Sequence, residues 1–111
     1  MTRVAVVTID EYCRDRRVEY IRLLKIDVEG FELSVLRGAK EMIAGGKIEA
    51  IQFEFNEMNV TGRTFLHDFM ECLGNAFSVY RILPHGLIEL KTNNHWFNEQ
   101  YTYQNLLAIK R

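Results

Sequence analysis

The sequence predicts a single α/β domain whose sheet is mostly parallel and ends in an antiparallel strand. Stretches rich in β-branched residues alternate with helical stretches. A connection long enough for a helix joins two of the strands, which is typical of parallel strands. Only a short connection precedes the last strand, which favours an antiparallel strand. The chain has 111 residues, which is enough for one domain over 1–111 and not for two.

The expected elements follow from local sequence patterns. Strands are predicted where β-branched and aromatic residues gather, and helices where apolar residues recur every three or four positions. The expected strands cover 3–9, 22–28, 48–55, 77–83, 87–90 and 103–110, and the expected helices cover 11–17, 31–44 and 63–73. We expect Asp10 to cap the first helix. Because a helix joins strand 22–28 to strand 48–55, these two strands should form a parallel βαβ unit.

Composition argues against several classes of protein. The 14 Lys and Arg residues nearly balance the 15 Asp and Glu residues, so we expect no nucleic-acid binding. No apolar run approaches the roughly 18 residues of a membrane helix, and the N-terminal apolar stretch is too short for a signal peptide. We therefore expect a cytoplasmic protein that binds no membrane. Cys13 and Cys72 lie far apart in the sequence and are expected to be reduced thiols.

Polar residues occur near the carboxyl ends of two expected parallel strands, where buried strands are usually apolar. They are Lys25, Asp27 and Glu29 at one strand end, and Gln52, Glu54 and Asn56 at the next. Neighbouring strands lie about 4.8 Å apart, so Asp27 and Glu54 would be close enough to share a site. This is the edge where open α/β sheets bind ligands.

The polar pattern has two interpretations. One is a polar cleft in which Asp27 is a general base or ligand contact, with further polar groups at Glu29, Glu54 and Asn56. The other is structural: Glu29 and Glu32 favour the helix start, Lys25 pairs with a carboxylate, and Glu54 faces solvent.

Three histidines lie outside this pattern or at its margin. His85 lies in the turn Pro84-His85-Gly86 and is either a proton acceptor or an exposed turn residue. His95 begins the run His95-Trp96-Phe97, which either lines a pocket or packs along a loop. His67 has no ligand-like spacing to the other two.

One block of the sequence resembles a motif of a known family. It reads KIDVEGFE over residues 25–32 and VLRGA over residues 35–39. It is similar to the block that joins a central strand to its following helix in the FkbM family of S-adenosylmethionine-dependent methyltransferases. Residues 7–12 (VTIDEY) resemble the TLDDY segment of that family, and residues 51–56 (IQFEFN) are similar to its next strand.

The resemblance implies a Rossmann-like methyltransferase sheet, of which this chain would supply the C-terminal part. The glycine-rich loop with which the family holds the cofactor has no counterpart in the sequence. A sheet divided in this way exposes a strand edge. We therefore expect either a homo-oligomer or association with a missing N-terminal half, unless strand 3–9 covers the edge.

The resemblance also implies methylation of an oxygen, commonly a hydroxyl of a sugar or natural product, with S-adenosylmethionine as methyl donor. It places catalysis at Asp27 and Glu29, and cofactor binding at Asp27 and Gly30. The residues expected to bind the small-molecule acceptor are Glu54, Asn56 and His85. No metal ligand is assigned, although carboxylates of this kind also suit a divalent cation. The alternative is a non-catalytic α/β binding or interaction module derived from the same fold.

Overall fold

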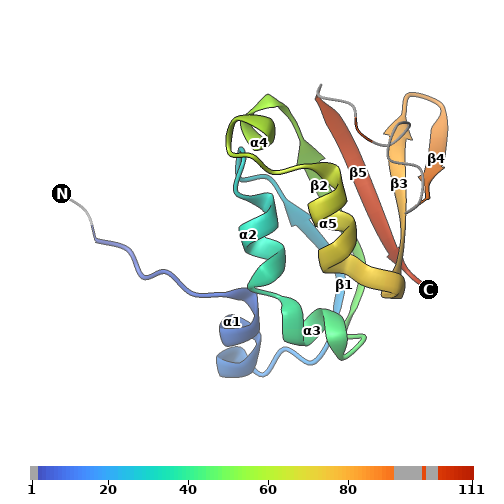
Figure 1. The fold of residues 1–111 in the computed structure, drawn as a ribbon. Helices are drawn as coiled ribbons and strands as arrows, with labels where there is room; N and C mark the ends of the chain where they lie inside the picture. Colours follow the sequence, from blue (N-terminus) through green and yellow to red (C-terminus); the bar gives the residue numbers. More distant parts are fainter. Residues whose placement is uncertain (1–2, 92–98, 100–102) are drawn as a thin grey trace.

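A five-stranded sheet carries its helices on one face in the computed structural model of the chain, which describes residues 3–91, 99 and 103–111 (Figure 1). The predicted α/β fold class is confirmed. In chain order the elements are α1 (Ile9–Arg16), β1 (Ile21–Ile26), α2 (Glu32–Arg37), α3 (Lys40–Ala44), β2 (Ile48–Phe55), α4 (Glu57–Thr61), α5 (Leu66–Leu73), the 3-10 helix η1 (Gly74–Ala76), β3 (Phe77–Leu83), β4 (Gly86–Leu90) and β5 (Gln104–Lys110).

The sheet is mixed, with the strand order β1-β2-β5-β3-β4. β1 and β2 pair in parallel, with Ile26 opposite Phe53, as the βαβ unit predicted. The pairs β2–β5, β3–β5 and β3–β4 are antiparallel. The expectation of a mostly parallel sheet was therefore wrong. β5 lies between β2 and β3 and is antiparallel to both. β2 and β3 therefore run in the same direction, but each pairs with β5 and not with the other.

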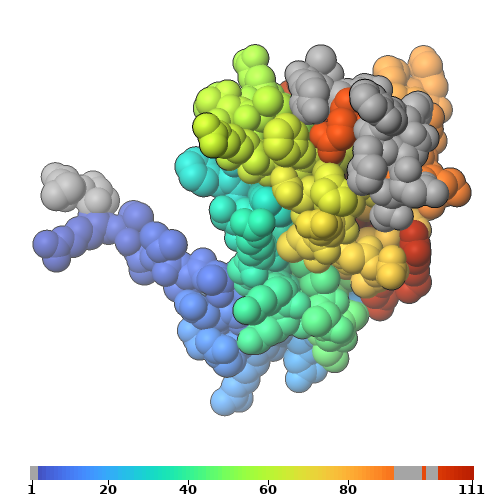
Figure 2. All heavy atoms as spheres, viewed as in Figure 1, coloured from blue at the N-terminus to red at the C-terminus, as the bar shows by residue number. Residues whose placement is uncertain are grey.

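The expected strand over 3–9 was also wrong. Residues 3–8 form an arm without regular structure, and the helix α1 begins at Ile9. The arm stands clear of the body of the molecule (Figure 2), and the side chains of Val4 and Val6 are 79% and 91% exposed. β-branched residues favour extended backbone, but a strand also needs a partner for its N–H and C=O groups.

The sequence predicted that Asp10 caps the first helix, and this prediction is wrong. The hydroxyl of Thr8 accepts from the Glu11 N–H at 3.1 Å and caps that helix instead. The carboxylate of Asp10 accepts from the N–H groups of Glu41 and Met42, at 2.9 and 3.0 Å, at the start of α3. Asp10 therefore ties α1 to a helix about thirty residues away.

The expected helix over 31–44 is divided into α2 and α3, with the break at Gly38 and Ala39. A Cβ atom at Gly38 would lie 3.1 Å from the Cβ of Thr8, so the glycine permits a close approach of α1. The expected helix over 63–73 begins only at Leu66, and α4, which precedes it, was not predicted. Such short helices give too little periodicity to be recognised.

The core lies between the sheet and the helices α2, α3 and α5. The ring of Phe69 on α5 stacks on Phe53 of β2, with centroids 4.9 Å apart and planes 15° apart. It also meets Phe55 edge to face at 6.1 Å. All three side chains are almost fully buried. This aromatic cluster fixes α5 on β2 directly below the strand end that carries Glu54 and Asn56.

The two cysteines are free, as expected, with Cys13 buried and Cys72 half-buried. Burial raises the pKa of both thiols. None of the helices in the described part of the chain combines the length and the hydrophobicity needed to cross a bilayer.

We expect Phe69→Ala to lower the free energy of unfolding by about 3–5 kcal/mol, because it leaves a cavity beside two buried rings. Denaturant unfolding monitored by circular dichroism measures the change. The matched control is Phe31→Ala, which truncates a side chain that is 69% exposed and should change stability by less than about 0.5 kcal/mol. Equal losses in the two variants would contradict the central position of Phe69.

Candidate functional site

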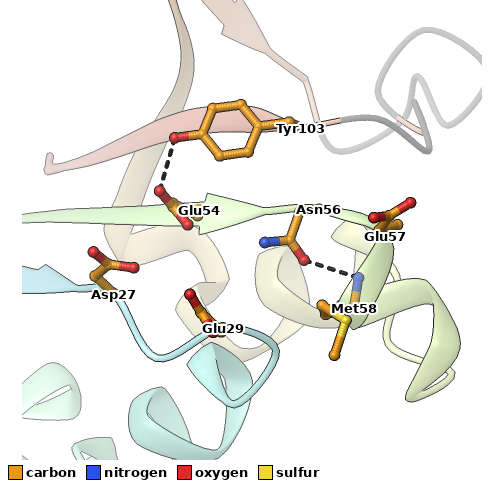
Figure 3. A pocket seen from close by; sticks show the side chains of 7 residues that line it. All are labelled: Asp27, Glu29, Glu54, Asn56, Glu57, Met58 and Tyr103. Atoms are coloured by element: carbon orange, nitrogen blue, oxygen red, sulfur yellow. Dashed lines mark hydrogen bonds between the residues drawn. The ribbon is translucent and has the colours of Figure 1, made fainter.

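The carboxyl ends of β1 and β2 meet at an open cavity of about 760 Å³ (Figure 3). Ile26 pairs with Phe53; Asp27 directly follows β1, and Glu54 is the next residue of β2. The prediction that these two carboxylates lie at one sheet edge is confirmed. The residues that line the cavity are Asp27, Glu29, Glu54, Asn56, Glu57, Met58 and Tyr103.

The turn after β1 is held by a buried carboxylate. Glu32 is fully buried, and its two oxygens accept from the N–H groups of Val28 and Gly30, at 3.1 and 2.9 Å. Within this turn, Glu29 has a φ angle of 45° and Gly30 has a φ angle of 105°, and both are positive. This conformation carries Glu29 to the cavity, whereas the Gly30 N–H points to Glu32. Gly30 does not line the cavity, so its expected contact with a cofactor has no support here.

The same carboxylate joins this turn to the segment after β2. The buried side-chain amide of Asn59 donates to Glu32 Oε1 at 3.1 Å, and its oxygen accepts from the Asn56 N–H at 3.0 Å. The Asn56 side-chain oxygen in turn accepts from the Met58 N–H at 2.9 Å and caps α4. Sequence reasoning had given Glu32 only a favourable charge at a helix start, because a contact with Asn59, 27 residues away, has no local signal.

Tyr103 is a site residue that the sequence patterns did not indicate. Its hydroxyl donates to Glu54 Oε1 at 2.8 Å and lies 3.4 Å from Asn105 Oδ1. Glu54 and Asn105 are opposite each other in the β2–β5 pairing, which brings the start of β5 to the cavity. The hydrogen bond to the Glu54 carboxylate is the main cause that raises the pKa of Tyr103. Only the strand order, which the sequence patterns do not specify, would have revealed this contact.

The cavity is acidic. Four of the seven described residues that line it are carboxylates, and none of these seven is Lys or Arg. Lys25 and Gln52 line an adjoining hollow of about 240 Å³, which shares Asp27, Glu54 and Tyr103 with the larger cavity. Such a lining favours ligands that carry positive charge or donate hydrogen bonds. Among the described residues, no three His, Cys, Asp or Glu side chains come together as metal ligands would.

The structural interpretation of the polar strand ends fails on two points. Glu54 is half-buried and accepts from Tyr103, so it does not simply face solvent. Lys25 makes no ion pair with another described residue. The prediction of a polar cleft therefore describes this edge of the sheet better.

The structure does not bring His85 to the cavity. His85 is exposed in the turn between β3 and β4 and does not line the cavity. β5 lies between β2 and β3, and this insertion moves the turn away from Glu54. The expected contact of His85 with an acceptor therefore has no structural support. The run His95-Trp96-Phe97 lies outside the described residues.

Comparison with protein families gives one match. The family model described as the methyltransferase FkbM domain matches residues 2–85 of the chain. The matched range contains six of the seven residues that line the cavity, all except Tyr103. Comparisons with curated proteins and with solved structures gave no match.

We expect Glu32→Gln to lower the free energy of unfolding by about 2 kcal/mol. Both oxygens of the Glu32 carboxylate accept hydrogen bonds, so the NH₂ group of a glutamine would face an N–H donor and leave it without an acceptor. Hydrogen exchange should accelerate at the Val28 and Gly30 amides. The matched control is Glu29→Gln, at an exposed position, which should change stability by less than about 0.5 kcal/mol. Unchanged exchange at both amides in Glu32→Gln would show that the carboxylate does not hold the turn.

We expect Glu54→Gln to lower the raised pKa of Tyr103 toward that of a free tyrosine. The neutral amide no longer opposes formation of the phenolate. Ultraviolet absorbance titration measures this, with Tyr103→Phe identifying the signal of the group. Glu57→Gln removes another carboxylate of the cavity and serves as control. A Tyr103 pKa that is equal in Glu54→Gln and the unmodified chain would contradict the hydrogen bond.

Proposed function

Because the chain belongs to the FkbM methyltransferase family, we propose that its cavity serves the transfer of a methyl group from S-adenosylmethionine to a hydroxyl of a small molecule, such as a sugar or natural product. The observation that carries this proposal is the side-by-side placement of Asp27 and Glu54 at the cavity. Both residues lie at the ends of paired strands, which hold functional groups more firmly than loops do. A cytoplasmic location is part of the proposal.

The carboxylates that line the cavity suit S-adenosylmethionine. This cofactor carries a sulfonium and an ammonium group, both cationic, and ribose hydroxyls that donate hydrogen bonds. Carboxylates at Asp27 and Glu29 suit such groups because they accept hydrogen bonds and carry negative charge. When bound, the cofactor would supply an electrophilic methyl group, and cleavage of the bond from sulfur to this methyl group would leave a neutral thioether.

The acceptor would be oriented by the β2 side of the cavity. Asp27 accepts the proton of the acceptor hydroxyl as a general base, which makes its oxygen a better nucleophile. Glu54, oriented by Tyr103, accepts a hydrogen bond from a second hydroxyl. The amide nitrogen of Asn56 points away from the Met58 N–H (Figure 3). In this proposal it donates a hydrogen bond to an oxygen of the methyl acceptor. Placing the hydroxyl in line with the methyl group supplies much of the rate.

A second candidate function is a non-catalytic binding module of the same fold. The observation that favours it is the acidic lining of the cavity, which suits a bound ligand whether or not a methyl group is transferred. In this case the acidic cavity would still bind a cationic or hydroxyl-rich ligand, without methyl transfer.

Titration calorimetry of S-adenosylmethionine into the chain tests the proposal. We expect saturable binding that Asp27→Asn weakens at least about tenfold, because an amide loses the negative charge that attracts the cofactor. The matched control is Asp15→Asn, an exposed position on α1, which should bind as the unmodified chain does. Saturable binding then justifies a screen of sugar hydroxyls for methyl transfer.

Two outcomes would contradict the proposal in different ways. Equal affinities in Asp27→Asn and Asp15→Asn would remove Asp27 from the cofactor site. No binding at millimolar cofactor would show that the chain alone holds no cofactor, and would favour the binding module.

A further inference from the structure

The arm formed by residues 3–8 has a fixed base and no regular secondary structure. Its base is fixed because Thr8 caps α1 and the Asp10 N–H donates to the Gly38 carbonyl at 2.9 Å. Toward the N-terminus the arm turns away from its own sheet (Figure 1). It consists largely of β-branched residues, whose side chains are mostly exposed. A segment of this kind readily becomes a strand when a partner edge is supplied.

Such an edge is present on the same chain. β1 is the first strand of the sheet, and among the residues that the structure describes it pairs with β2 alone, so its other edge has no partner strand there. The arm and β1 have six residues each. In extended conformation both span about 20 Å. An unpaired edge of this length is a template for another extended segment.

Exposed apolar side chains also gather in this part of the chain. Fifteen large apolar residues are exposed among those the structure describes, and eight of them lie between residues 4 and 31: Val4, Val6, Val7, Tyr12, Tyr20, Leu23, Val28 and Phe31. A mostly apolar hollow of about 310 Å³ lies between the arm and α2, and Phe31 lines it. Packing of the exposed valine side chains of the arm against a partner would therefore remove apolar surface from water.

We propose that the arm of one copy adds as a strand to the β1 edge of a second copy, and that the exchange is reciprocal. A second copy is the favoured occupant because one chain carries both the segment without a partner and the edge without a partner. The basic residues Arg3, Arg22 and Lys25 lie on the two surfaces, so charge attraction does not drive the contact. Backbone hydrogen bonds and burial of valine side chains do. The interface does not depend on the proposed methyl transfer.

Sedimentation velocity of the full chain between about 1 and 200 µM tests this proposal. We expect a monomer–dimer equilibrium that added salt does not weaken. Deletion of residues 2–7, which keeps the Thr8 cap, should weaken dimerisation at least about tenfold. Leu23→Lys should do the same by placing a charge beside the edge. The control is Leu87→Lys on β4, at the opposite edge, which is similarly exposed (49% against 55%) and should leave dimerisation unchanged.

Mixing the two weakened proteins tests the exchange directly. The deleted chain keeps an intact β1 edge, and the Leu23→Lys chain keeps an intact arm, so a mixture can form one of the two contacts. We expect heterodimers at concentrations where each protein alone is monomeric. Cooperative thermal unfolding of each variant shows that it is folded.

Two results would overturn the proposal. A chain that stays monomeric at about 200 µM would assign the edge to a different polypeptide. A dimer that survives deletion of the arm would place the interface elsewhere on the molecule.

Discussion

The candidate site depends on one buried carboxylate. Glu32 accepts hydrogen bonds from two N–H groups of the turn after β1 and from the Asn59 amide of α4. A carboxylate in the protein interior is strongly unfavourable unless such donors surround it. The donors and the carboxylate therefore hold one another in place. The turn that carries Glu29 and the segment that carries Asn56 are joined through this group, and the sterically costly left-handed backbone at Glu29 is maintained by it.

The insertion of β5 is the second constraint on the site. It places Asn105 opposite Glu54 and thereby brings Tyr103 to the cavity. The same insertion moves β3 one strand further from β2 and takes His85 with it. One feature of strand order thus explains both a site residue that was missed and one that was wrongly included. It also leaves β2, the strand of Glu54, paired on both sides.

Local sequence patterns predicted the structural features that depend on residues close together in the sequence. The alternation over 48–55 and the crossover from β1 to β2 follow from periodicity and connection length, and these two features place Asp27 beside Glu54. Apart from the short helices, the failures concern contacts, present or missing, between residues that lie far apart in the sequence. Residues 3–8 have strand composition but no partner strand, and Tyr103 reaches a residue 49 positions away. Local sequence patterns do not show which residues far apart in the sequence come into contact.

The unpaired edge and the candidate site lie on the same strand. Asp27 directly follows β1, so a strand added along the free edge of β1 would lie next to this carboxylate. The cavity is at present bounded by the turn after β1, by β2 and by the start of β5. An added strand would supply a wall on the side of β1, reduce the exposure of Asp27 to water and strengthen its electrostatic interactions with a ligand. The proposed association through β1 would therefore be coupled by position to the proposed ligand binding at Asp27, and we expect the affinity of the cavity to rise with the fraction of chain that is associated.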